Sequence, residues 1–161
     1  MIAGLTPGLL LAGLLLLMPA TGSAHATGLA ERPDPPAASD TTVITVSTFG
    51  ANLDFEPARF SAQQGTVVRV VYVNESVLPH NLVVVKDPDD VAMLGQAAYT
   101  ADETGFVPME HEDRMIAYTD LASPGETVEV VFTMPEAGEY TFVCLVPGHY
   151  NMMLGVMRST E

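Results

Sequence analysis

The sequence predicts an all-β protein, a Greek-key β-sandwich that carries one short helix in an inserted loop. Short segments of alternating or β-branched residues recur from residue 43 to the end of the chain, and turns rich in Gly, Pro or Asp separate them. About six or seven short strands, with a turn every ten residues or so, are typical of two packed antiparallel sheets.

Two patterns predict the individual strands. Residues 43–48 and 127–130 alternate between apolar and polar side chains, which indicates strands with one buried face. Residues 66–73 and 82–85 are Val-rich runs that are too short for helices, which indicates strands in the core. The full set of predicted strands is 43–48, 66–73, 82–85, 127–132, 139–144 and 154–158.

A long acidic segment, residues 87–114, interrupts the strand pattern. Within it, residues 91–98 have the composition of a short helix. Connections of this length between neighbouring elements are uncommon in compact domains. We therefore expect an excursion on the surface of the sandwich, with one short helix inside it.

Residues 1–26 predict an export signal. Residues 9–18 form an apolar run, and Ala-His-Ala at residues 24–26 matches a signal-peptidase site. Residues 27–42 contain three prolines and little to bury, which predicts a flexible tether before a single domain over residues 43–161. The mature protein is then periplasmic or extracellular, or membrane-tethered if the signal stays uncleaved.

The chain is strongly acidic, with a formal net charge of −14 from 6 basic and 20 acidic side chains. Phosphate binding needs clustered Lys and Arg, so nucleic acid is excluded as a partner. An acidic surface favours a basic partner through electrostatic steering, and a simple role in solubility explains the same charge equally well.

The single cysteine lies in a segment whose residue types suit a transition metal. This segment reads CLVPGHYNMMLG and places Cys144, His149 and Met153 between two predicted strands. The Pro-Gly turn inside it brings the thiolate and the imidazole together, and His80, in a loop before an upstream strand, supplies a second imidazole. Two imidazoles, one thiolate and a weak thioether form the ligand set of an electron-transfer copper site, so one copper ion is the predicted cofactor.

The same residues carry a resemblance to known copper proteins. The segment CLVPGHYNMMLG resembles the ligand loop of azurins and auracyanins, and Pro-His-Asn at residues 79–81 is similar to the upstream ligand motif of plastocyanins. The resemblance covers residues 55–156 and implies a cupredoxin-like fold, a type 1 (blue) copper site and one-electron transport. It selects Met153 over Met152 as the axial ligand.

The chain departs from the azurin pattern in two ways. The disulfide of azurins is absent, because the chain has one Cys. Pro79 stands where azurins carry Gly, which leaves open whether a backbone carbonyl at that position contacts the copper.

We expect several residues near the proposed ligands to support or surround the metal site. The resemblance implies that Asn81 ties the two ligand loops together by bonding to the backbone of the Cys144 loop. Met152 is interpreted as part of an apolar rim, and His111 as a solvated loop residue. The edge of His149 is expected near the surface, where it serves as the electron port. The neighbours expected around it are Val146, Pro147, Tyr150 and Met152.

These features together predict a one-electron carrier that is not an enzyme. Its expected partners are redox proteins such as cytochromes or copper enzymes, and it is expected to be a monomer without a small-molecule substrate. A copper carrier or storage protein without a redox role is the alternative. A copper enzyme would need further His ligands, of which only His111 is left, and a copper-free sandwich would make the ligand loop a coincidence.

Overall fold

The computed structural model describes residues 41–161, so the predicted signal (1–26) and nearly all of the predicted tether (27–42) lie outside the described residues. The described part contains eight strands and one α-helix. The strands are β1 (Thr42–Gly50), β2 (Arg59–Gln63), β3 (Val67–Ser76), β4 (Val83–Val85), β5 (Met115–Tyr118), β6 (Thr127–Thr133), β7 (Gly138–Val143) and β8 (Leu154–Thr160). All six strands expected from the sequence are present, and β2 and β5 are additional.

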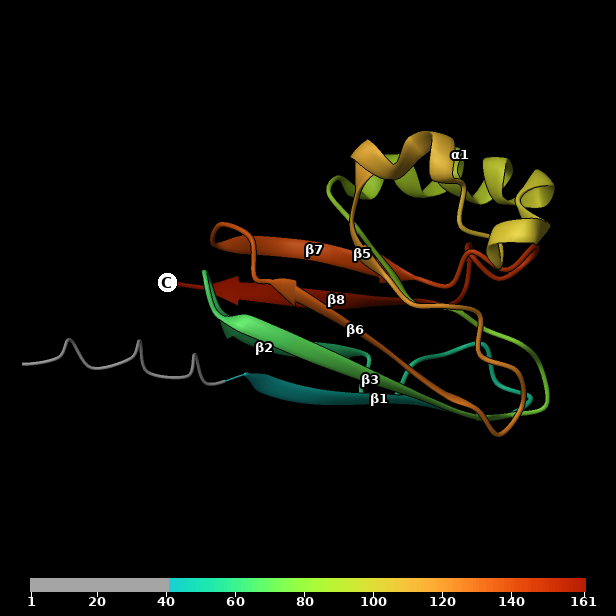
Figure 1. The fold of residues 1–161 in the computed structure, drawn as a ribbon, viewed down its shortest axis with the longest axis horizontal. Coiled ribbons are helices and arrows are strands. Elements are labelled where there is room, and N and C mark those ends of the chain that lie inside the picture. Colours follow the sequence, from blue (N-terminus) through green and yellow to red (C-terminus); the bar gives the residue numbers. More distant parts are fainter. Residues whose placement is uncertain (1–40) are drawn as a thin grey trace, which may run out of the picture. The chain divides into compact units, whose positions relative to one another are not determined.

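The strands form two sheets, one with the order β1-β3-β6 and one with the order β2-β8-β7-β4-β5 (Figure 1). The sheets are mixed and not purely antiparallel as expected, because β1 pairs with β3 and β2 pairs with β8 in parallel. The chain reverses direction twice between β1 and β3, once on crossing to β2 in the other sheet and once on returning. As a result β3 runs in the same direction as β1.

Alternation along the strands fills the space between the sheets with apolar side chains. The ring of Phe55 bridges the two layers, with centroids 5.9 Å from Tyr72 of β3 and 5.0 Å from Phe142 of β7. Gly155 of β8 allows the close approach of Phe142, because a Cβ atom at this position would lie 2.0 Å from the Phe142 ring. Full burial of each large side chain in this layer stabilises the fold by about 1.5–3 kcal/mol.

The insertion between β4 and β5 forms a third layer, on the outer face of the five-stranded sheet. It contains α1 (Val91–Ala97), in agreement with the helix expected at 91–98, and four 3-10 turns, and it lies over β5 and β7 (Figure 1). The 3-10 turns are η1 (Pro88–Asp90), η2 (Ala98–Thr100), η3 (Asp102–Thr104) and η4 (Met109–Arg114). Leu94, Ala98 and Val107 pack in a second buried cluster with Val83 and Val85 of β4. This cover explains why β4 is apolar at every position.

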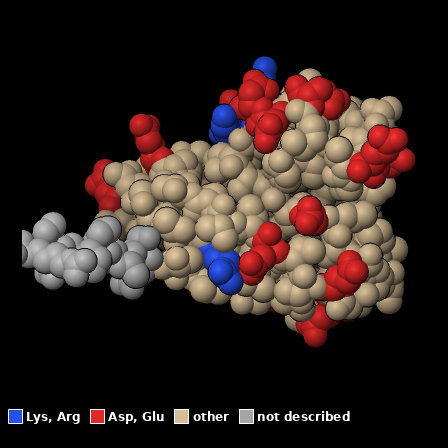
Figure 2. Space-filling view, in the orientation of Figure 1, with Lys and Arg blue, Asp and Glu red and all other residues tan. Residues whose placement is uncertain are grey.

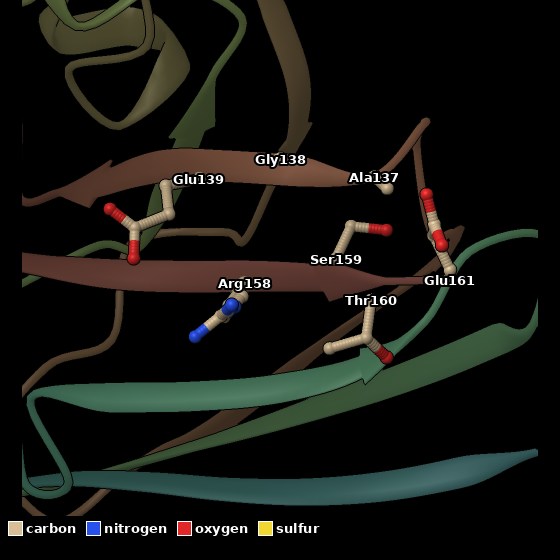
Figure 3. A pocket seen from close by; sticks show the side chains of 7 residues that line it. All are labelled: Ala137, Gly138, Glu139, Arg158, Ser159, Thr160 and Glu161. Atoms are coloured by element: carbon tan, nitrogen blue, oxygen red, sulfur yellow. The ribbon is translucent and has the colours of Figure 1, made fainter.

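Acidic groups are more prominent than basic groups on the face of the molecule drawn in Figure 2. A surface hollow of about 540 Å³ lies between the start of β7 and the end of β8, with Glu139, Arg158 and Glu161 among its lining residues (Figure 3). None of the predicted metal ligands lines this hollow, which lies at the end of β7 opposite Cys144.

Among the described residues, no helix combines the length and the hydrophobicity that a membrane crossing requires.

Candidate metal centre

Three of the four predicted ligands converge at the end of the sandwich where β7 ends. The Cys144 Sγ atom lies 3.7 Å from His80 Nδ1 and 3.5 Å from His149 Nδ1. All three donor atoms lie within 4.8 Å of one another, and within residues 41–161 they form the one such group of His, Cys, Asp or Glu side chains. The two imidazole rings are tilted by 42° with centroids 5.0 Å apart, so both rings face one small space.

Strand alternation explains why the cysteine and the methionine point inward. Phe142 and Cys144 belong to the core between the sheets, whereas the intervening Val143 faces the insertion. In the same way, Met153 and Met157 face the core from β8 and the residues just before it. The backbone N–H of Cys144 donates to the Met153 carbonyl at 3.1 Å, which holds the two ends of the loop together.

A tight turn places His149 opposite the sulfur. The His149 N–H donates to the Val146 carbonyl at 2.9 Å, and Gly148 has a φ of 88°, a conformation that favours glycine. The His149 carbonyl in turn accepts from the N–H groups of Met152 and Met153, both at 2.9 Å. These short-range bonds explain why the sequence spacing alone predicted the convergence.

His80 is held by a polar network that the sequence did not indicate. The inward positions of β3 change from apolar to polar at the metal end, where Asn74 and Ser76 are buried. The Ser76 hydroxyl donates to the Leu78 carbonyl at 2.9 Å and lies 2.9 Å from His80 Nε2. Because that hydroxyl has one hydrogen, His80 Nε2–H donates to it, and Nδ1 is left with a free lone pair toward Cys144.

The backbone of His80 is fixed as well. Its N–H donates to the Ala122 carbonyl at 3.0 Å, and its carbonyl accepts from the Ala122 N–H at 2.8 Å. Asn74 Nδ2 also donates to the Ala122 carbonyl at 2.8 Å. The strand alternation of 67–76 could have pointed to Asn74 and Ser76, since polar residues at inward positions of a Val-rich strand need partners.

Asn81 ties the two ligand loops together, which confirms its expected role. Its side-chain oxygen accepts from the Leu145 N–H at 2.8 Å, directly after Cys144. Its side-chain nitrogen donates to the Gly105 carbonyl at 2.9 Å, so the tie extends into the insertion. A partner in the insertion was not expected from the sequence.

The buried site sets the protonation of its donors. Burial raises the pKa of the Cys144 thiol to about 11, while backbone N–H groups of Asn81 and Val146 at the sulfur oppose this shift. Burial, together with neighbouring His149, lowers the pKa of His80 to about 4, and burial also lowers the pKa of His149. At neutral pH both imidazoles are therefore uncharged, and a metal held here would take the place of the thiol proton.

The exposed part of the site differs from expectation. His149 is partly exposed, as expected for an electron port, and Met152 is 61% exposed in line with a rim position. The prediction that Val146 and Tyr150 surround the His149 edge at the surface is wrong, because their side chains are only 7% and 6% exposed. Their side chains lie in the two buried clusters, Val146 between the sheets and Tyr150 beneath the insertion.

The donor set fits copper. A thiolate and two imidazoles within 4.8 Å of one another, with the buried thioether of Met153 in the same core cluster, combine soft sulfur with nitrogen. The backbone N–H groups of Asn81 and Val146 supply donors to the thiolate that such a site contains. His111 lies in the turn η4 of the insertion and takes no part in the group.

Comparisons with known proteins agree with this chemistry. The model of the family described as "Copper binding proteins, plastocyanin/azurin family" matches residues 42–158. Auracyanin A of Chloroflexus aurantiacus is 34% identical over 119 residues, which cover 73% of this chain and 74% of the relative. Its solved structure, named a "blue" copper protein, superposes with a TM-score of 0.71 at 32% identity and covers 74% of this chain and 99% of its own.

Two further relatives extend the comparison. Auracyanin B of the same organism is 37% identical over 101 residues, which cover 61% of this chain and 43% of the relative. The copper-resistant cuproprotein CopI of Rubrivivax gelatinosus is 28% identical over 137 residues, which cover 81% of this chain and 76% of the relative. The family match at residues 42–158 covers nearly all of the sandwich and includes both ligand loops.

Proposed function

The chain belongs to the plastocyanin/azurin family of copper-binding proteins, and we propose that it carries single electrons on one copper ion held by His80, Cys144, His149 and Met153. It is a blue copper protein with a single type 1 site, from a family of electron carriers and not of enzymes. The observation that supports this ligand set best is the convergence of one sulfur and two Nδ1 atoms in a space closed by the sandwich core.

The chain's own residues prepare the site for electron transfer. When bound, copper supplies the one-electron Cu(II)/Cu(I) couple. His80, Cys144 and Met153 are 0% exposed, so water is excluded, and their backbones are held by hydrogen bonds within the sheets and the loop. Ligands held in this way keep their positions in both oxidation states, which keeps the rearrangement during each transfer small.

Electrons enter and leave through the edge of His149 in this proposal. It is the one histidine of the site that reaches the surface. Exposed apolar side chains lie at the same end of the sandwich, on the loop after β3 and on the ligand loop, namely Val77, Leu78 and Met152. An apolar patch around a metal-linked edge favours brief, close contact with a redox partner.

Replacement of the cysteine tests the copper site directly. The copper-loaded protein is expected to be intensely blue, because a Cys thiolate bound to Cu(II) gives the strong colour of these sites. Cys144→Ser should abolish the colour, as measured by visible absorption. Weak absorption of the wild-type Cu(II) protein, of the kind that nitrogen and oxygen ligands give, would contradict the type 1 assignment.

A copper carrier is the second candidate, because the relative CopI is named for copper resistance. An electron carrier keeps its metal through many redox cycles, whereas a copper carrier hands it to an acceptor. Competition for Cu(I) with a chelator, run beside stopped-flow oxidation by a soluble cytochrome, separates the two. Slow electron exchange together with ready metal loss would contradict the electron carrier and support the copper carrier.

The protein exchanges electrons with redox partners, and its charge suggests what these partners are like. With a net charge of −14, a basic partner is attracted at long range. The rate of electron exchange with a basic cytochrome should then fall as salt is raised from about 0.01 to 0.15 M, where screening becomes effective. A rate that does not change with salt would mean that docking depends on the apolar patch alone.

Export of the mature protein to the periplasm or the extracellular space is part of the proposal. Its support is the apolar run and the Ala-His-Ala site near the start of the sequence. Mass spectrometry of the protein from its host should give an N-terminus at residue 27. An intact N-terminus in the membrane fraction would instead indicate the anchored form.

A further inference from the structure

The insertion between β4 and β5 is much longer than the connection requires. These two strands are antiparallel neighbours, with Val83 opposite Tyr118 and Val84 opposite Ala117. A hairpin loop of about two to five residues joins such strands in most proteins. Here the connection runs from residue 86 to residue 114 and includes α1. The extra chain therefore serves something other than linking the strands.

We propose that α1 positions His149 by clamping the side chain of its neighbour Tyr150, with Gly95 and Gln96 as the positioning residues. The proposal concerns the ligand geometry of the electron carrier proposed above, and it rests on His149 being a ligand. It gives the insertion a role in the metal centre although none of its residues lies among the donors.

The contact between the helix and the ring is unusually close. A Cβ atom at Gly95 would lie 2.3 Å from Tyr150 Cγ and 2.5 Å from both Cδ atoms, so the helix backbone lies directly on the face of the ring. The Gln96 side-chain amide donates to the Tyr150 hydroxyl, which fixes the far end of the ring. Tyr150 is 6% exposed and packs in the buried cluster with Leu94.

The fixed ring limits the movement of the ligand before it. Tyr150 directly follows His149 in the chain, and the His149 carbonyl already accepts two hydrogen bonds from the same turn. The packing of Gly95 on the Tyr150 ring and the hydrogen bond from Gln96 to the Tyr150 hydroxyl add two constraints. Both hold the backbone from which the His149 imidazole extends. This matters at His149 in particular, because no side-chain hydrogen bond to His149 other than its contact with Cys144 Sγ occurs within the described residues.

A second connection shows that the insertion as a whole is built against the ligand loops. The Gly105 carbonyl accepts from Asn81, the neighbour of His80. Gly105 and Phe106 both have left-handed conformations, with φ of 65° and 67°, and such a φ is uncommon and strained for phenylalanine. Phe106 packs against both buried clusters, which keeps the carbonyl aimed at Asn81. The insertion thus contacts the residue after each histidine.

The platform under these contacts is rigid. Leu94 and Ala98 are 0% exposed and lie in one cluster with Val85 of β4 and Leu145, the residue after Cys144. The helix is therefore anchored on β4 and β7, the strands beside the ligand loops, and does not depend on its own short length for stability. A displacement of α1 relative to these strands would be transmitted to Tyr150 through contact alone.

Gly95→Ala tests the clamp, since the added methyl group must displace the Tyr150 ring. Alanine favours a helix over glycine, so a loss cannot be attributed to helix propensity. We expect copper loss to a chelator to be about tenfold faster, within the range of effects seen for residues that orient metal ligands, and the Cu(II) EPR spectrum and the reduction potential to shift. Gly138→Ala is the matched control, because a Cβ atom there meets nothing nearer than 3.6 Å.

Two further variants test the clamp without relying on Gly95→Ala alone. Gln96→Ala deletes the hydrogen bond without a clash and should speed copper loss two- to threefold, about as Tyr150→Phe does. On a Tyr150→Ala background, Gly95→Ala should have almost no further effect, because the obstructing ring is gone. Val46→Ala, in β1 of the other sheet, provides a destabilised control, because Val46 belongs to the core between the sheets and not to the cluster that holds Tyr150.

The outcomes separate this proposal from the proposed function. The clamp predicts that Gly95→Ala changes copper retention, the EPR spectrum and the reduction potential more than Val46→Ala does when both variants lose the same amount of melting temperature. Equal changes in the two variants would overturn the clamp. Amide NMR of the metal-free protein adds a test that needs no copper: Gly95→Ala and Gln96→Ala should shift the signals of His149 and its loop, and unchanged signals overturn the clamp. Absence of blue colour in the wild type would instead contradict the electron carrier.

Discussion

The two histidines of the metal centre are held in opposite ways. His80 is 0% exposed, its Nε2–H donates to Ser76, and its backbone pairs with Ala122 on both sides. His149 is partly exposed, lies in a tight turn, and is fixed through the residue that follows it. His80 is thus anchored by hydrogen bonds inside the sandwich, and His149 is held through the packing of Tyr150 beneath the insertion.

This difference suits a protein that must bind a metal firmly and still reach a partner. A site with two buried histidines would isolate the copper from other proteins, and a site with two exposed ones would admit water and lose the metal. Here one imidazole edge alone is available at the surface. Exposure of a single ligand confines electron transfer to one place, near the exposed Met152.

Deletion of each imidazole is the strongest way to break the comparison. His80→Ala leaves a buried cavity and removes one of the hydrogen bonds of the Ser76 hydroxyl, and it should lower the free energy of unfolding of the metal-free protein by about 2–4 kcal/mol. His149→Ala, at a partly exposed site, should cost less than about 1 kcal/mol. Urea unfolding monitored by circular dichroism measures both.

The copper-loaded forms of these variants give the control. Added imidazole should restore blue colour to His149→Ala, because the empty position opens to solvent. It should not do so for His80→Ala, whose position is closed by β3 and the loop of Ala122. Equal recovery in both variants would contradict the anchored and exposed roles.

A change at Ser76 sharpens the comparison, because His149 has no equivalent side-chain partner within residues 41–161. Ser76→Ala removes the acceptor of the buried Nε2–H, which should lower the stability of the metal-free protein by about 1–3 kcal/mol and copper affinity by about 10–100-fold. Ser76→Thr keeps the hydroxyl and should retain most of the affinity. Urea unfolding and chelator competition provide the two measurements, with Ser61→Ala on the exposed side of β2 as the control. If Ser76→Ala lowers stability and copper affinity no more than Ser61→Ala does, the hydrogen bond to Ser76 does not anchor His80.

The adjacent methionines repeat the comparison on a smaller scale. Met153 is 0% exposed and Met152 is 61% exposed. Met153→Leu should keep copper and raise the reduction potential, because loss of the weak axial donor leaves Cu(II) less stabilised, and it should change stability by less than about 1.5 kcal/mol. Met152→Leu should leave the potential unchanged. Cyclic voltammetry of both variants decides, and the reverse pattern would make Met152 the axial ligand.

The parts of the site that the sequence predicted are those that local geometry determines. Cys144, His149 and Met153 lie within one loop, and its turn brings the first two together through bonds between near neighbours. The short helix at Val91–Ala97 was predicted to within one residue for the same reason. His80 lies 64 positions before Cys144, yet the Pro-His-Asn motif was sufficient to identify it.

Other features depend on contacts between distant segments, and the sequence did not indicate them. The strands β2 and β5 have five and four residues, and they are stable because they pair with β8 and β4. Tyr150 was expected at the surface as a neighbour of the exposed edge of His149. It is buried because α1, more than fifty residues earlier in the chain, lies on its ring.

By itself, the sequence determined the all-β class, the donor atoms and the metal that such donors suit, because alternation and ligand chemistry are properties of residue types and short spacings. The tertiary structure alone decided how each histidine is held. That outcome depends on where β3 places Ser76 and on where the insertion covers the ligand loop. Both are consequences of how layers pack, which no local pattern in the chain encodes.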